Sequence, residues 1–69
     1  MNYNSKALRI DNQGVVVYIG EAATKASDSA AMWRIRKLET DASVFLITWA
    51  DGNELYDNVW DDRASLTYF

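Results

Sequence analysis

Two short runs of β-branched and aromatic residues set the pattern of this chain. Val15–Ile19 lies between Gly14 and Gly20, and Val44–Trp49 is followed by the turn signal Asp51-Gly52-Asn53. Short runs of such residues, bounded by glycine and turn-forming residues, are typical of β-strands. Both alternating sets of side chains in the second run are apolar, so we expect that strand to be buried on both of its faces.

A third strand is predicted over residues 32–39, where apolar and basic residues alternate. Trp33 and Ile35 fall on one side of an extended segment, and Arg34 and Arg36 fall on the other. We therefore expect the first pair to face the core and the two arginines to project together. Two like charges so close need compensating acids, which the acidic C-terminal segment could supply within the same fold or from a neighbouring copy.

The remaining segments are predicted as connections and short strands. Residues 22–30 form an irregular or briefly helical connection, and residues 39–43 form a polar hairpin loop. Leu55-Tyr56 is expected to begin a return strand. The alternation in Ala64–Phe69 predicts an edge strand that closes the chain.

Residues 57–63 are predicted to form one helical or 3-10 turn between two strands. Asp57 is a good N-cap, and acidic residues follow in the first turn. Val59 and Trp60 are available to pack inward. The two acids after Trp60 are expected to be solvated or paired with Arg63, so most of the acids here have structural roles.

Together these segments predict a mainly β fold: a small antiparallel sheet, or a sandwich- or barrel-like domain, with hairpins and one short helical turn. Residues 1–69 form a single domain, with a polar N-terminal arm over residues 1–14 and a β core over residues 15–69.

A domain of this size buries only about 60% of the surface of its unfolded chain. Such domains often depend on disulfides, a metal or a partner subunit. The chain has neither Cys nor His, so we expect oligomerisation, or docking into a larger assembly, to take this role.

Several function classes are excluded by the residues that the chain lacks. Without Cys or His there are no thiolate or imidazole metal ligands and no histidine general base. Asp51, Asn53 and Asp57 match a calcium loop only in part, because Leu55 stands where a ligand is needed. The three glycines form no phosphate-binding loop, and so small a chain can hardly build a substrate cleft. We therefore expect no enzyme activity, and no metal, cofactor or small-molecule substrate.

Charge and hydropathy also bear on the partners. The net charge is −3, and after residue 50 five acids stand against a single arginine. An acidic chain repels phosphate backbones, so no nucleic-acid partner is expected. The apolar runs are far shorter than the roughly 20 residues that span a membrane, and the polar N-terminus lacks the apolar region of a signal peptide. No membrane partner is expected.

Four segments carry a resemblance to a known group of proteins. They are Tyr18-Ile19-Gly20, Ser29–Leu38 (SAAMWRIRKL), Ile47–Asn53 (ITWADGN) and Tyr56–Tyr68 (YDNVWDDRASLTY). In this order they resemble a group of short proteins encoded by tailed bacteriophages. The resemblance covers roughly residues 17–68 and leaves the first fourteen residues outside it.

The resemblance implies a small structural component of the virion, made in the host cytoplasm. We expect a tail-tip, baseplate or fibre-attachment protein that acts as a symmetric oligomer and contacts other virion proteins and copies of itself. One alternative is a decoration protein of the phage head. Another, of a different class, is an intracellular module that binds and inhibits a host protein. From the residues themselves, the candidates for partner contact are the basic stretch and the acidic turn: Arg34, Arg36, Lys37, Trp60, Asp61, Asp62 and Arg63.

Overall fold

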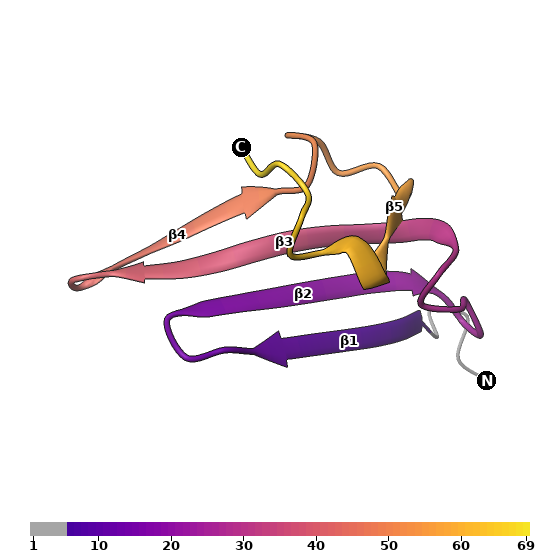
Figure 1. The fold of residues 1–69 in the computed structure, drawn as a ribbon, viewed down its shortest axis with the longest axis horizontal. Coiled ribbons are helices and arrows are strands. Elements are labelled where there is room, and N and C mark those ends of the chain that lie inside the picture. Colours follow the sequence, from indigo (N-terminus) through magenta and orange to yellow (C-terminus); the bar gives the residue numbers. More distant parts are fainter. Residues whose placement is uncertain (1–5) are drawn as a thin grey trace.

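The computed structural model describes residues 6–69, which form a single antiparallel meander (Figure 1). Its elements are β1 (Lys6–Asn12), β2 (Val16–Ala23), β3 (Ala31–Asp41), β4 (Val44–Trp49), β5 (Asn58–Val59) and the 3-10 turn η1 (Trp60–Asp62). The strands are ordered β1-β2-β3-β4, and β5 pairs with the start of β3. The prediction of a mainly β, antiparallel fold is confirmed.

Two tight hairpins place their tips at the same end of the sheet (Figure 1). In the β1–β2 turn, Gly14 has a φ of +87°, and its N–H donates to the Asn12 side chain at 2.9 Å. In the β3–β4 turn, Ala42 has a φ of +56°. Because β3 continues to Asp41, this turn is shorter than the predicted loop over residues 39–43. The β2–β3 connection contains turns and no helix, as an irregular segment would.

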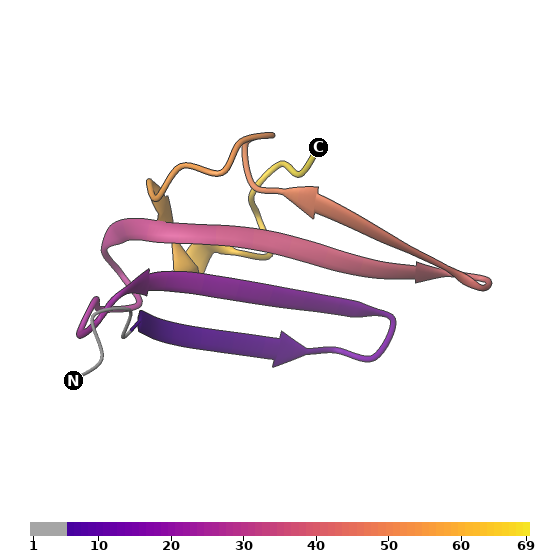
Figure 2. The same ribbon diagram turned by 180° about the vertical axis from the view of Figure 1, so that it is seen from behind.

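The register divides the sheet into two unlike faces. Gly20 pairs with Ile35 and Glu21 pairs with Arg34, so neighbouring residues along β3 alternate between the faces. The C-terminal segment, residues 58–69, crosses the face that carries Ile35, which we call the covered face. Figure 2 views the sheet from the other side, which we call the open face; of the described segments beyond the sheet, the loop over residues 53–56 lies against it at one end.

The core lies on the covered face and is small. Within the described residues, the buried apolar side chains are those of Tyr18, Ala22, Trp33, Ile35, Ala50 and Trp60. The rings of Trp33 and Trp60 lie 5.8 Å apart between centroids, and the Trp33 indole N–H donates to the Ser27 carbonyl at 2.9 Å. The prediction that Trp33 and Ile35 face the core is therefore confirmed.

The prediction that β4 is buried on both of its faces is wrong. Phe45 and Ile47 are 65% and 59% exposed on the open face, and Val44 and Leu46 are 54% and 47% exposed on the other. The C-terminal segment covers only the opposite end of the sheet, so the tip of the β3–β4 hairpin has no covering layer within residues 6–69 on either face (Figures 1 and 2).

The N-terminal part of the chain also differs from its prediction. Residues 6–12 form β1, which pairs with β2 along its whole length, instead of a polar arm. Residues 1–5 lie outside the described part of the chain. Apolar and charged residues alternate in Lys6–Asn12, which is a strand pattern. The segment was predicted as an arm because so many of its residues are polar.

Three predictions for the C-terminal segment need correction. Leu55-Tyr56 begins no strand, because the chain turns after Asp51 and pairs again only at β5. The 3-10 turn is present, but its N-cap is Val59 and not Asp57, and no side chain caps it. In place of an edge strand over residues 64–69 there is one bridge between Ala50 and Tyr68.

Candidate interaction surface

The open face of the sheet is the feature of this fold most suited to contact another molecule. Its cross-strand rows follow from the register: one row runs Ile10, Ile19, Arg36, Trp49, and the next runs Asn12, Val17, Leu38, Ile47. Phe45, opposite Thr40, extends the face toward the hairpin tips. Charged side chains lie at one end of this face and apolar side chains at the other.

The apolar end forms a continuous patch across all four long strands. We call it the apolar patch and define it as Ile10, Val17, Ile19, Leu38, Phe45 and Ile47. Ile10 is 70% exposed, Phe45 is 65% exposed and Ile47 is 59% exposed. The other three side chains of the patch are partly exposed. The patch offers roughly 500 Å² of apolar surface, which is at the upper end of the largest patches on soluble monomers and typical of interaction sites.

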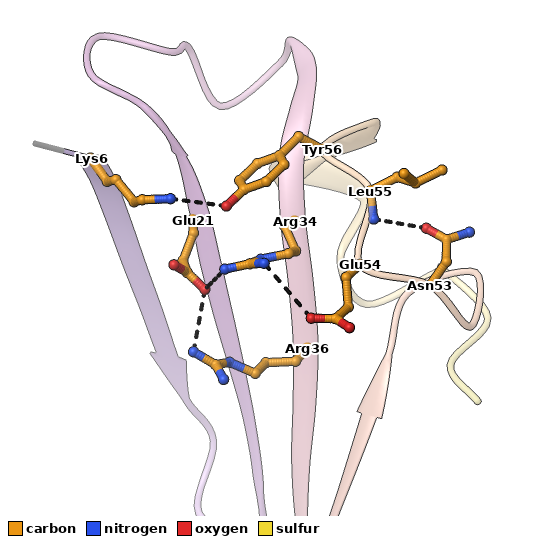
Figure 3. Close-up of polar contacts among 8 residues, drawn as sticks. All are labelled: Lys6, Glu21, Arg34, Arg36, Asn53, Glu54, Leu55 and Tyr56. Atoms are coloured by element: carbon orange, nitrogen blue, oxygen red, sulfur yellow. Dashed lines mark hydrogen bonds and ion pairs between the residues drawn. The ribbon is translucent and has the colours of Figure 1, made fainter. Parts of the chain in front are cut away.

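The other end is a charged cluster centred on Glu21 (Figure 3). Its carboxylate oxygen accepts hydrogen bonds from Arg34 at 3.0 Å and from Arg36 at 3.3 Å. The Glu21 side chain is only 14% exposed, so solvent screens these pairs less than it would a surface pair. A more distant carboxylate, that of Glu54, lies 3.8 Å from Arg34 and is 67% exposed.

The Tyr56 side chain holds the loop over residues 53–56 against this cluster. The Arg34 guanidinium lies 4.8 Å from the Tyr56 ring centroid and 5.4 Å from that of Trp49. Lys6 donates to the Tyr56 hydroxyl at 2.9 Å, so the loop also contacts β1 (Figure 3). The Asn53 side chain accepts the Leu55 N–H at 3.0 Å and shapes the turn. The loop therefore shields the charged end and leaves the apolar end bare.

The structure brings together only part of the predicted contact set. Arg34 and Arg36 do project together, but their main partner is Glu21 on the neighbouring strand, which the sequence interpretation missed. Glu21 could be identified only from the register between β2 and β3, which places it opposite Arg34. Of the C-terminal acids, the expected partners, only Glu54 reaches an arginine of this pair.

The remaining candidates lie on the covered side of the molecule, away from the two arginines. Lys37 pairs with Glu39 at 3.4 Å, and its ammonium lies 4.9 Å from the Tyr68 ring. Trp60 is 5% exposed and belongs to the core, so the prediction that it contacts a partner does not agree with its position. Asp61 and Asp62 are exposed.

Arg63 joins the C-terminal segment to β1 and does not pair with the acids beside it. Its Nε donates to Asp11 at 2.9 Å, and its carbonyl accepts the Tyr68 hydroxyl at 2.8 Å. Hydrogen bonds from Gln13 and Arg63 lower the pKa of the Asp11 carboxyl. Burial, together with the neighbouring Tyr18, raises the pKa of the Tyr68 hydroxyl above its ordinary value of 10.0. These contacts fix the layer that covers the core.

Comparisons of this chain with protein-family models, with curated proteins and with solved structures give no match. Within residues 6–69, the acidic side chains form no group of three or more that could hold a metal ion. Over the same residues, no helix is long and apolar enough to cross a membrane.

Proposed function

We propose that this protein is a non-enzymatic structural component of a tailed-phage virion, and that its open sheet face is buried against neighbouring subunits. The observation that carries the proposal is the apolar patch, which extends over four strands of a sheet that has only one covering layer within the described residues. Its place in the particle is proposed as the tail tip, the baseplate or the fibre attachment, in a symmetric oligomer.

Two further arguments support an assembly role. A domain with so few buried side chains gains stability from whatever binds its folded form, by mass action. The four sequence segments that resemble short phage proteins include residues of both layers: Trp33 and Trp60 of the core, and Arg34, Arg36 and Trp49 of the open face. The resemblance thus includes core residues and residues that border the patch, and it leaves out β1.

The test is mass spectrometry of purified virions of the phage that encodes this chain. We expect the protein at a stoichiometric level that survives extensive washing, and its absence from intact particles would overturn the proposal. Immunogold labelling of the same particles locates the protein: label at the tail end supports the preferred position. Label distributed over the head supports the alternative, a decoration protein of the capsid.

A second class of function is favoured by one specific observation. The five C-terminal acids, Asp51, Glu54, Asp57, Asp61 and Asp62, are all exposed. Such a set can bind a basic surface, so the alternative is an intracellular module that binds and inhibits a host protein. In that case the protein is absent from virions and, during infection, is recovered in a complex with one host protein. The complex would weaken with rising salt, and replacing the five acids by their amides would abolish it.

A further inference from the structure

We infer that the open face binds the same face of a second copy of this chain, so that two sheets form a two-fold sandwich with the apolar patches at its centre. The inference deepens the proposed function, because it uses the same surface, and it names the partner. Sheets that pack face to face bury alternating side chains from both inner faces, which is the arrangement that the open face leaves incomplete.

The size of the face fits a stable dimer. Standard stable interfaces bury about 800 Å² on each partner. With its rim of Leu8, Asn12, Arg36 and Thr40, the apolar patch offers about this area, and Leu8 alone is 60% exposed. The free edge of β4 offers much less, because the strand has six residues and Trp49 at its end already pairs with Phe69. The face, and not the edge, therefore has the area that a dimer needs.

The distribution of charge favours a second copy over a charged partner. The six residues of the apolar patch carry no charge, so two such patches can meet about a two-fold axis without opposing like charges. The charged cluster borders the patch at the end shielded by residues 53–56, where Arg36 belongs to both the cluster and the rim, and Glu21 compensates both arginines within the same chain. In a pair centred on the patches, the two clusters lie at opposite rims of the interface.

The shape of the molecule agrees with this arrangement. Both hairpin tips lie beyond the part of the sheet that the C-terminal segment covers (Figure 1). The loop that shields the charged cluster belongs to residues 53–56, and the apolar end of the open face is free of it. A second sheet can therefore approach the apolar end without displacing any described element of the first.

The test is sedimentation equilibrium of the purified full chain, with variants placed on either face. We expect a species of twice the 7.9 kDa chain mass for the natural sequence. Ile47→Lys and Ile10→Lys place a charge on the open face from β4 and from β1, and each is expected to raise the dimer dissociation constant by about a hundredfold or more. Leu46→Lys is the matched control: it lies on β4 next to Ile47, is 47% exposed and points to the opposite face.

Circular dichroism and the emission of the core tryptophans establish that each variant is folded. Loss of the dimer in both open-face variants, with Leu46→Lys still dimeric, supports the inference. A natural chain that remains monomeric at high micromolar concentration would overturn it. So would a dimer that survives Ile10→Lys but is lost in Leu46→Lys, since that pattern indicates contact through the opposite face of β4. A monomeric protein that is still found in virions overturns the dimer alone, whereas a dimer absent from virions overturns the proposed function alone.

Discussion

Trp60 lies directly over Gly20, so closely that a Cβ on Gly20 would be 2.6 Å from Cε3 of the indole ring. The glycine leaves space for the ring at the centre of β2, and the second indole, that of Trp33, lies 3.1 Å from the same point. The C-terminal segment therefore docks on the sheet by placing a large ring where a strand has no side chain.

The first prediction follows from this contact. Gly20→Ala forces the Trp60 ring away from the sheet and should lower the free energy of unfolding by about 1–3 kcal/mol. The measurement is urea denaturation followed by tryptophan emission. In a Trp60→Leu background the same glycine substitution should cost clearly less, because the clashing ring is absent. Equal costs in the two backgrounds would show that the destabilisation comes from the backbone of β2 and not from the clash with the Trp60 ring.

The second prediction compares two tryptophans that the sequence alone does not distinguish. Trp33 is fully buried, so Trp33→Ala should cost about 3–5 kcal/mol, enough to unfold so small a domain. Trp49 lies on the open face beside Arg34 and Arg36, so Trp49→Ala should cost only about 1–2 kcal/mol, from lost packing and cation–π contacts. Near-UV circular dichroism and melting curves check both. A Trp49 variant that fails to fold while the Trp33 variant melts normally would reverse this assignment of the core.

The difference between these tryptophans shows how far the sequence could predict the fold. Strand positions followed from local patterns: β2 and β4 contain short runs of β-branched and aromatic residues bounded by glycine or turn signals, and period two is visible in β3. Which face is covered depends on where the C-terminal segment docks, and that is a long-range property. An apolar run such as Val44–Trp49 indicates burial equally well whether the covering layer is in the same chain or absent from it.

The same limit applies to the candidate surface. The sequence predicts that Arg34 and Arg36 share a face, since this needs only the alternation within one strand. Their partner, Glu21, depends on the register between β2 and β3, which no local signal near either residue determines. The acids of residues 51–62 were the more abundant candidates, and abundance in the sequence was a poor guide to proximity.

The third prediction concerns this charged cluster. Glu21→Gln leaves two partly buried arginines without their main carboxylate and should cost about 1–3 kcal/mol of stability. The matched control is Glu54→Gln, which should be nearly neutral because Glu54 is exposed and more distant from Arg34. Since the pairing is within the chain, Arg34→Glu combined with Arg36→Glu should destabilise the isolated domain itself. A double variant with an unchanged melting curve would indicate that the arginines act only toward a partner.

The last prediction uses the titration of Tyr68. Its hydroxyl donates to the Arg63 carbonyl at 2.8 Å, and burial raises its pKa in the folded state above the ordinary 10.0. The unfolded chain therefore loses this proton first as the pH rises, so the contribution of Tyr68 to stability is complete below about pH 10 and is lost above it. Tyr68→Phe should cost about 1 kcal/mol at neutral pH, for the lost hydrogen bond, and should make the decline in stability above pH 10 shallower.

Urea denaturation over a series of alkaline buffers measures both effects. Tyr56→Phe is the control, because it removes an exposed tyrosine hydroxyl on the opposite face and leaves the Tyr68 hydrogen bond in place. An equal decline in the Tyr68 variant would mean that other groups govern unfolding at high pH.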